Sequence, residues 1–231
     1  MPASAVEAAP NYKGHLLSNS VSRQETNHVP EPVAPIAELM SSFRPPWALC
    51  GGWAIDAWLG RQTRDHGDLD IAVFQDDHHA LFEHLAGWQL VADDTSVERG
   101  KPWNGRPLSL PAHIHARFSV TGEPLPDLGA VLTASQGWGL EFQMNERSGD
   151  DWILSRQPRI SLPLRKGVQQ SPWGLPTVVP EVLLFFKGRE LRRRDKLDFL
   201  ALLPDLTQEQ RDWLRSAISL VGHPWLSQLS P

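Results

Sequence analysis

Cysteine is almost absent from this sequence of 231 residues, and its single Cys50 cannot form an internal disulfide. We expect Cys50 to be a small buried hydrophobe rather than a catalytic thiol. No apolar run approaches the roughly 18 to 20 residues that are needed to cross a bilayer. No basic start followed by an apolar stretch marks a secretory signal. These absences predict a soluble, cytoplasmic protein.

The sequence also lacks an excess of positive charge. Its 22 Lys and Arg residues are outnumbered by 27 Asp and Glu residues, for a net charge of −5. A nucleic-acid binder normally needs a basic surface, so we expect neither a nucleic-acid nor a membrane partner. The basic run at 192–194 is more typical of a solvated connection between two helices.

Enough apolar residues are present, at 41% of the chain, to build a substantial core. Residues 1–32 show no helical or strand period and are predicted to be a flexible leader. Short strand-like runs then alternate with helical ones, which predicts an α/β domain over residues 35–165. From 178 to 222 the spacing is helical, and Thr207 with Gln210 forms a capping box there, so we expect a C-terminal helical segment.

Within the α/β domain, the order of elements can be predicted from the apolar spacing. Helices are expected at 36–43, 53–59 and 77–85, and strands at 47–50, 68–74, 88–92, 113–120 and 139–145. Between them, residues 93–137 are rich in proline, glycine and small polar residues. A loop of that length inside a compact domain is usually functional or disordered.

The chemistry centres on Asp68-Leu69-Asp70. Residues two apart on a strand point to the same side, so both carboxylates face one point. Two like charges at such a short distance repel each other unless a cation lies between them. Mg²⁺ held by one or two carboxylates, with nucleotide phosphates as further ligands, fits this pattern. Asp-x-Asp alone is also common on surfaces, so context has to decide.

Two further features supply that context. Gly51-Gly52 lies between a strand and a helix, where glycines let a phosphate approach the backbone N–H groups of the helix start. Glu141 lies on the polar side of the strand at 139–145 and could bring a third carboxylate to the site. A plain tight turn and a solvent-facing glutamate are the structural alternatives.

Most histidines carry a weaker signal. His78 and His79 are adjacent on a predicted helix and point apart, so neither they nor His84 is expected to bind metal. His113 and His115 can place both rings on one side of a strand. We interpret these two as lining an acceptor site.

The stretch from Gly51 to Asp70, GGWAIDAWLGRQTRDHGDLD, resembles the signature of aminoglycoside 2''-adenylyltransferases and their nucleotidyltransferase relatives. It contains the double glycine, the Gly-Arg-x-Thr-Arg-x-His stretch and the Asp-x-Asp at its usual distance. A looser similarity covers residues 141–152, 180–187 and 194–199. The loop at 93–138 does not match that family clearly.

The resemblance implies a polymerase-β-like nucleotidyltransferase core with a mixed sheet, in which Asp68 and Asp70 bind Mg²⁺. The enzyme would transfer a nucleoside monophosphate, AMP from ATP, to a hydroxyl of a small molecule such as an aminoglycoside. Glu141 is then the base or a third metal ligand. The residues that match the family's nucleotide-contacting positions are Gly51, Gly52, Arg64, His66 and Lys187.

Each of these positions keeps a structural alternative. Arg64 can equally be an ion-pair partner, His66 is better placed as a core or supporting residue than as a base, and Lys187 can extend to solvent. The acidic pairs 76–77, 93–94 and 150–151 favour a polycationic acceptor. Three interpretations compete with this one. The acceptor can be another molecule, such as a lincosamide, a sugar or a metabolite. The protein can also be a catalytically inactive binding protein or a glycosyltransferase. A monomer and a homodimer are both open.

Overall fold

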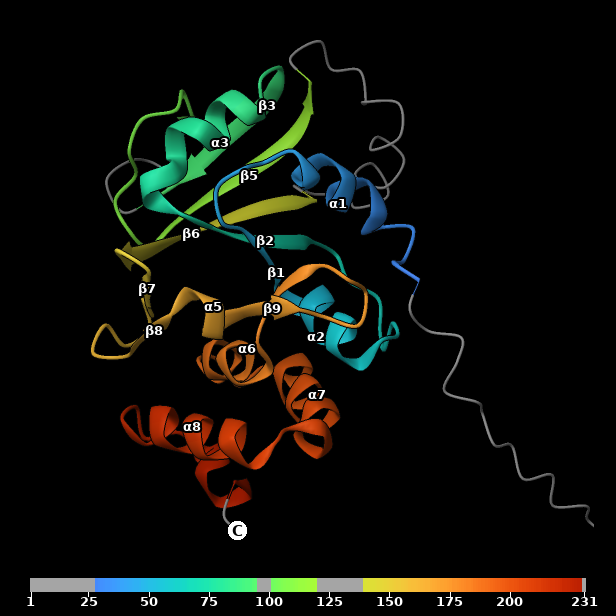
Figure 1. Cartoon of the computed structure of the whole chain (residues 1–231), viewed down its shortest axis with the longest axis vertical. Coiled ribbons are helices and arrows are strands. Elements are labelled where there is room, and N and C mark those ends of the chain that lie inside the picture. The colour runs from blue at the N-terminus through green and yellow to red at the C-terminus, as the bar shows by residue number, and fades with distance from the viewer. Residues whose placement is uncertain (1–27, 95–100, 120–138, 230–231) are drawn as a thin grey trace, which may run out of the picture.

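A mixed sheet forms the centre of the protein in the computed structural model, which describes residues 28–94, 101–119 and 139–229 (Figure 1). The strand order is β4-β3-β5-β6-β2-β1-β10-β9, and β7 and β8 branch off β6 as a short antiparallel extension. Most of the predicted leader lies outside the described residues. In the described ranges, no helix is both long and apolar enough to span a membrane.

The N-terminal part of the fold follows the predicted order of elements. The elements are α1 (Ala34–Ser41), β1 (Ala48–Cys50), α2 (Gly51–Leu59), β2 (Leu69–Phe74), η1 (Gln75–Asp77), α3 (His78–His84), β3 (Trp88–Asp93), β4 (Lys101–Pro102) and β5 (Ala112–Ser119). Helix α2 ends at Gly60, whose left-handed backbone conformation closes it. Helix α2 begins at Gly51 itself, two residues earlier than predicted, so the glycines belong to its first turn.

Strand β6 (Leu140–Ser148) confirms the alternation in the sequence. Leu140, Phe142 and Met144 are buried, while Glu141 and Gln143 on the opposite face are half-buried. Strand β7 (Asp151–Ile153) pairs with it in antiparallel fashion across the tight turn at 149–150. The neighbours of β6 are β5, antiparallel, and β2, parallel. Its polar face therefore lies between residues from both strands.

The segment between the two predicted parts contains elements that the sequence pattern did not predict. They are β8 (Ser161–Pro163), α5 (Leu164–Gly167), β9 (Val168–Gln170) and β10 (Pro176–Val178). Each has only three or four residues, which is too short for a period to be read. Strand β10 pairs in parallel with β1, so the sheet continues past residue 165 to Val178.

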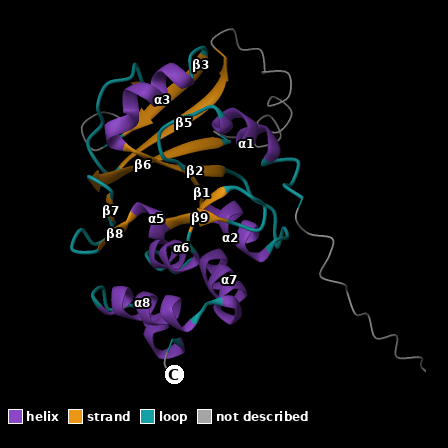
Figure 2. Cartoon of the chain, in the orientation of Figure 1, coloured by secondary structure: helices purple, strands orange, loops and turns teal. Residues whose placement is uncertain are grey.

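The C-terminal segment is helical, as predicted. It comprises α6 (Pro180–Lys187), α7 (Arg193–Leu202), η2 (Leu203–Asp205), α8 (Gln208–Ser219) and η3 (Pro224–Gln228). Both hydrogen bonds of the capping box between Thr207 and Gln210 are present. These helices lie on the side of β1 and β9 away from α3 (Figure 2). Helix α6 contacts α2, α7 and α8, and one hydrophobic core runs from the sheet into this helical layer.

Candidate active site

Three carboxylates gather where β2 and β6 begin. Asp70 and Glu141 are register partners on these parallel strands, so their side chains leave the same face of the sheet. Asp68 lies one residue before β2 and is exposed. Leu69 and Ile71, which alternate with the acids, are buried in the core. Asp70 therefore lies on the strand as predicted, whereas Asp68 lies just before it, and Glu141 lies beside Asp70.

The two glycines at the start of α2 let this helix approach the acids. Gly51 has a φ of +67°, and a Cβ atom on it would lie 1.8 Å from Oδ2 of Asp70. A Cβ on Gly52 would lie 2.3 Å from Nδ1 of His66. Only glycine fits at either position without displacing its neighbour. The N–H groups of the first turn of α2, which have no partner within the helix, therefore lie directly beside the carboxylates.

Asp70 is the most perturbed acid of the site. Burial, followed by the charges of Asp68 and Glu141, raises its pKa to about 7. A hydrogen bond from Nε2 of Gln143, 3.1 Å from Oδ1, and the charge of Lys187 oppose that rise. The charged form of Asp70 is therefore disfavoured in this group of acids. A bound cation would favour it.

Glu141 is held by histidines of β5. Nδ1 of His113 bonds to Oε1 of Glu141, and Nδ1 of His115 lies 3.7 Å from Oε2. Burial opposes ionisation of Glu141, but the hydrogen bond and charge of His113, with the charge of His115, hold its pKa below the ordinary value. The same hydrogen bond raises the pKa of His113. The two rings lie on one side of the strand, as their spacing predicts.

The donor set fits a metal ion that completes its shell with ligands from a substrate. In the described part of the chain, no three His, Cys, Asp or Glu side chains converge as a self-sufficient metal site. Asp68 and Asp70 supply two hard oxygen donors, which suits Mg²⁺ because it usually keeps water and phosphate ligands. Glu141 adjoins them, but its oxygens face His113 and His115. Its role as base or third metal ligand stays a prediction.

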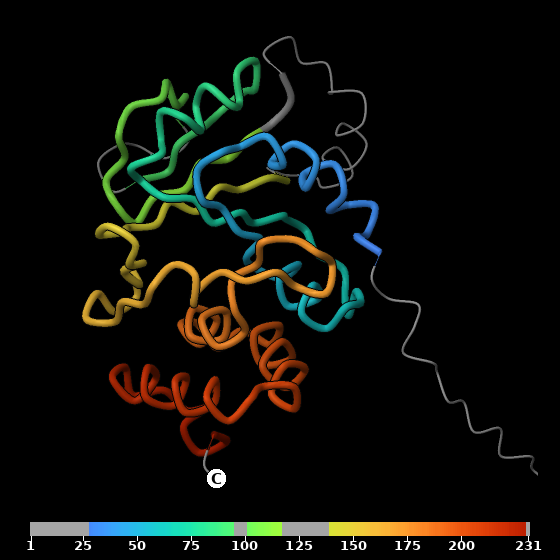
Figure 3. Tube along the Cα trace, in the orientation of Figure 1, coloured from blue at the N-terminus to red at the C-terminus, as the bar shows by residue number. Residues whose placement is uncertain are grey.

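Arg64 and Lys187 meet at Asp198, although they are far apart in the sequence, and we call the part of the site that they form the cationic wall. Nε and Nη2 of Arg64 each lie 3.2 Å from a carboxylate oxygen of Asp198. Nζ of Lys187 lies 2.7 Å from Oδ2 of the same residue. In Figure 3 the cyan segment after α2 lies near α7, which carries Asp198. Arg64 is thus both an ion-pair partner and a cavity residue.

His66 lies behind the helix start. Its Nε2 donates to Oδ2 of the buried Asp56 at 2.6 Å, and its ring lies 4.4 Å from that of Trp53. The Asp56 carboxylate also accepts a hydrogen bond from the Thr63 hydroxyl. The His66 side chain is 2% exposed and presses against Gly52. This placement suits a residue that fixes the loop before β2 rather than a base.

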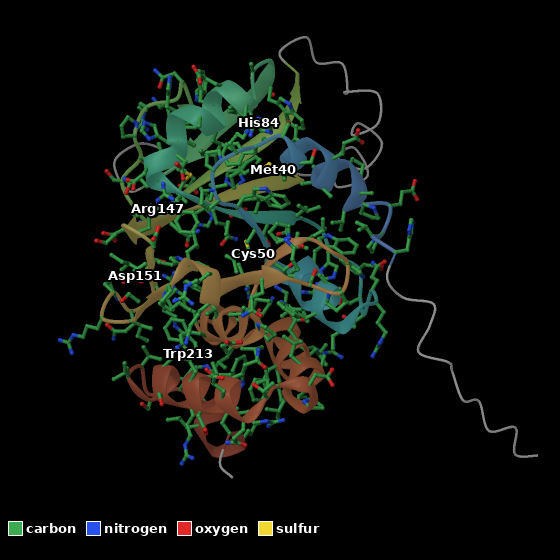
Figure 4. All side chains as sticks on the ribbon, in the orientation of Figure 1. Met40, Cys50, His84, Arg147, Asp151 and Trp213 are labelled. Carbon is green, nitrogen blue, oxygen red and sulfur yellow. The ribbon has the colours of Figure 1, made fainter. Side chains whose placement is uncertain are left out.

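One cavity of about 550 Å³ joins most of these features, but Glu141 and His66 are not among its lining residues. Figure 4 labels Cys50, one of its lining residues and the last residue of β1, in the middle of the molecule. The other charged or polar lining residues are Arg64, Asp65, Asp68, Asp70, His113, Gln143, Asn145, Ser155, Lys187, Arg189, Arg192 and Arg194. An apolar side is formed by Met144, Trp152, Leu183 and Phe186. Burial raises the pKa of the Cys50 thiol, as expected for a small buried hydrophobe.

The structure changes two interpretations of charged segments. The basic run at 192–194 is more than a solvated connection, because Arg192 and Arg194 line the cavity. The acidic pair Asp76 and Asp77 is bonded to Arg147, at 3.5 Å and 3.1 Å, and does not line the cavity. These acids therefore give no support to a polycationic acceptor.

Several residues of the site were not identified from the sequence. Asp195 and Asp198 form ion pairs with the cations of the site, and Gln143 donates a hydrogen bond to Asp70. The available signal was a pair of acids three residues apart on a helix, which places them on one face. The remaining histidines are accounted for locally, since His78 and His84 bond to backbone carbonyls and the exposed His79 pairs with Glu83.

Comparison with known proteins agrees with this geometry. Residues 33–101 match the family model of aminoglycoside-2''-adenylyltransferase, a region that holds α2, β2 and the Asp-x-Asp. No curated protein sequence matches the chain. The solution structure of the antibiotic-resistance factor ANT(2'')-Ia superposes with a TM-score of 0.51 at 15% identity, over 81% of this chain and 89% of that one.

A crystal structure of ANT(2'')-Ia in complex with adenylyl-2''-tobramycin gives a TM-score of 0.50 at 14% identity, over 82% of this chain and 96% of that one. At such identity the structural likeness establishes the fold, while the family model supplies the sequence relationship. Over residues 33–101 the chain is therefore similar to the aminoglycoside-2''-adenylyltransferase family, and its fold is that of ANT(2'')-Ia.

Proposed function

We propose that the protein is a Mg²⁺-dependent enzyme that transfers AMP from ATP to a hydroxyl of a small, antibiotic-like molecule. The observation that carries this proposal is that acids and cations line one and the same cavity. Asp68 and Asp70 supply metal donors on one wall, and Arg64 and Lys187 supply cations on the other. The glycine-bearing start of α2 lies beside them. Metal-bound phosphates need this combination.

The reaction forms a bond between the acceptor oxygen and the α-phosphorus and breaks the bond from that phosphorus to the bridging oxygen, so that pyrophosphate leaves. Magnesium, when bound, neutralises phosphate charge. Asp68 and Asp70 would hold it, while the start of α2, Arg64 and Lys187 orient the phosphates. Glu141, beside Asp70, would take the acceptor proton or act as a third metal ligand.

The acceptor is the finer part of the proposal. The family match and the tobramycin product bound to ANT(2'')-Ia favour an aminoglycoside. Lincosamides, sugars and other hydroxylated metabolites are the alternatives. Acceptor choice depends on loops, and residues 95–100 and 120–138 lie outside the described chain. We place the enzyme in the cytoplasm, as a monomer or homodimer.

A catalytically inactive binding protein with the same fold is the competing class. Such a protein needs to keep its core, but it has no need of a metal-binding acid pair or of glycines against that pair. Here Gly51, Gly52, Asp68, Asp70 and Glu141 are all present and adjacent. Retention of this set supports catalysis.

The test is incubation of the purified protein with Mg²⁺, each of the four nucleoside triphosphates, and panels of aminoglycosides, lincosamides and sugars. Pyrophosphate release and acceptor mass are recorded together. We expect ATP to give a mass gain of one AMP on a single acceptor class. Triphosphate binding without turnover would favour the inactive binding protein or an untried acceptor, whereas no triphosphate binding would overturn the proposed function.

A further inference from the structure

Two buried acids of α7 stand behind the cationic wall of the cavity. Asp195 and Asp198 are three residues apart on one face of the helix, and their side chains are 0% and 3% exposed. Neither lines the cavity. We call them the acid pair. A buried carboxylate is unfavourable unless a cation pairs with it. Arg64, Lys187 and Arg192 supply those cations here.

Asp198 binds two of these cations at once. Arg64 reaches it with Nε and Nη2, both at 3.2 Å, and Lys187 reaches it with Nζ at 2.7 Å. Burial disfavours the charged form of Asp198, but the hydrogen bond from Arg64 and the charge and hydrogen bond of Lys187 lower its pKa. Asp198 is therefore an anion at neutral pH, fixed between two long side chains that would otherwise be mobile.

Asp195 serves Arg192 in the same way. Nε and Nη2 of Arg192 lie 2.7 Å and 3.2 Å from its two oxygens, and Nζ of Lys187 lies 3.8 Å from Oδ1. Nη1 of Arg192 also lies 3.3 Å from Oε2 of the exposed Glu190, so three carboxylates pair with the three cations. Arg189 and Arg194 also line the cavity, and neither has an ion pair among the described residues. The wall thus stays positive towards the cavity.

Pairing does not use up the donors of these cations. A guanidinium has five N–H donors and an ammonium has three. Arg64 spends one donor each at Nε and Nη2 on Asp198, and one at Nη1 on the Asp65 carbonyl oxygen at 3.1 Å. Two donors of Arg64 and two of Lys187 remain for a phosphate. Because both side chains are already fixed, little conformational entropy is lost when a phosphate binds.

We propose that Asp198 is a positioning residue, which holds Arg64 and Lys187 in the orientation that binds the phosphates of a nucleoside triphosphate. The inference rests on the proposed function and deepens it. Asp198 acts through the two cations and contacts no substrate. It joins the loop before β2 to helices α6 and α7, so the phosphate wall exists only when both parts of the chain are folded together.

The test compares Asp198→Asn with the parent and with Asp205→Asn, a matched amide substitution at an exposed position of η2. Dissociation constants for ATP and for adenosine are measured in Mg²⁺, together with the melting temperature. We expect Asp198→Asn to weaken ATP binding roughly tenfold or more, as loss of a supporting partner typically does, with adenosine affinity unchanged. Asp205→Asn should match the parent.

The experiment distinguishes failure of the proposed function from failure of the positioning role of Asp198. If the parent itself does not bind ATP, the proposed function fails. If the parent binds ATP and Asp198→Asn binds it equally well, or loses ATP and adenosine in the same proportion, the positioning role is overturned. Should Asp198→Asn not fold, Asp198→Glu replaces it. That variant keeps the charge but moves it by one methylene, and unchanged ATP affinity in it would contradict the inference.

Discussion

The two walls of the cavity carry opposite charges and are stabilised in opposite ways. On the acidic wall, burial and the charges of Asp68 and Glu141 raise the pKa of Asp70 to about 7, although the charge of Lys187 opposes that rise. On the cationic wall, Arg64 and Lys187 are neutralised in part by Asp198, whose pKa is lowered. In the proposed function Mg²⁺ completes the first wall, whereas the ion pairs of the second wall form without a ligand.

This difference between the walls predicts different effects of ligand binding on each. Repulsion between carboxylates destabilises the free site, and a cation between them relieves it. On the cationic wall, the acid pair already orders the long side chains of the cations, so little of their conformational entropy remains to be lost on binding. Removing a group from the acidic wall should therefore abolish chemistry and spare the fold, whereas removing a buried acid from the cationic wall should weaken both binding and stability.

Asp70→Asn gives the sharpest test of the acidic wall. It removes a metal donor and should lower kcat by roughly 10³-fold or more, the order found when charge stabilisation is lost from a transition state. The melting temperature without metal should not fall, because an amide removes the repulsion. Asp76→Asn is the control, since Asp76 follows the same strand but is largely exposed. Full activity in Asp70→Asn would refute the two-carboxylate model.

Gly51→Ala tests how closely α2 must approach that wall. The new Cβ would lie 1.8 Å from Oδ2 of Asp70, at a residue with positive φ. Displacement of about 1 Å can cost on the order of 10² in rate, and we expect a loss of that size in kcat/KM. Gly149→Ala controls for backbone strain, because Gly149 also has positive φ but a Cβ added there would meet no neighbour within 4 Å. Equal losses in both variants would mean that strain alone is responsible.

Glu141→Gln asks whether the third acid belongs to the metal site. Because its oxygens face His113 and His115, we expect kcat to fall on the order of 10²-fold, the size typical of a lost general base. The Mg²⁺ concentration for half-maximal rate should stay the same. A Mg²⁺ titration checks this, and a large increase in that concentration would instead assign Glu141 to the metal.

The smallest expected effect is on stability, and its sign differs between the walls. The pKa of Asp70 is raised from 3.8 to about 7, so its contribution is fully present below about pH 4 and is lost as pH rises through 7. The pKa of Asp198 is lowered, so its contribution is present above about pH 4 and is lost as pH falls through the folded pKa.

Thermal melts of metal-free protein from about pH 2 to pH 8 measure this difference. Relative to the parent, Asp70→Asn should gain several degrees in melting temperature as pH rises towards 8. Asp198→Asn should melt below the parent at pH 7, with a deficit that narrows only below pH 4. If the Asp70→Asn difference stayed flat across that range, burial and the neighbouring acids would not disfavour the charged form of Asp70 as described above.

Much of the fold could be predicted because its longer elements carry clear periods. The alternation of β6 placed Phe142 in the core and Glu141 on the polar face, and both hold in the structure. The three-residue strands β9 and β10 could not be predicted, since their pairing with the sheet depends on distant partners rather than on local pattern.

The sequence by itself determined which groups are available and where they sit on their own elements. It placed Asp68 and Asp70 on one side of a strand, put glycines at a helix start, and set His113 and His115 on a common face, because strand and helix periods are local properties of the backbone. Only the tertiary structure decided that Arg64 and Lys187 share Asp198, and that Glu141 faces His113. Those contacts join segments far apart in the chain, so strand register and helix packing, which no local period encodes, bring them together.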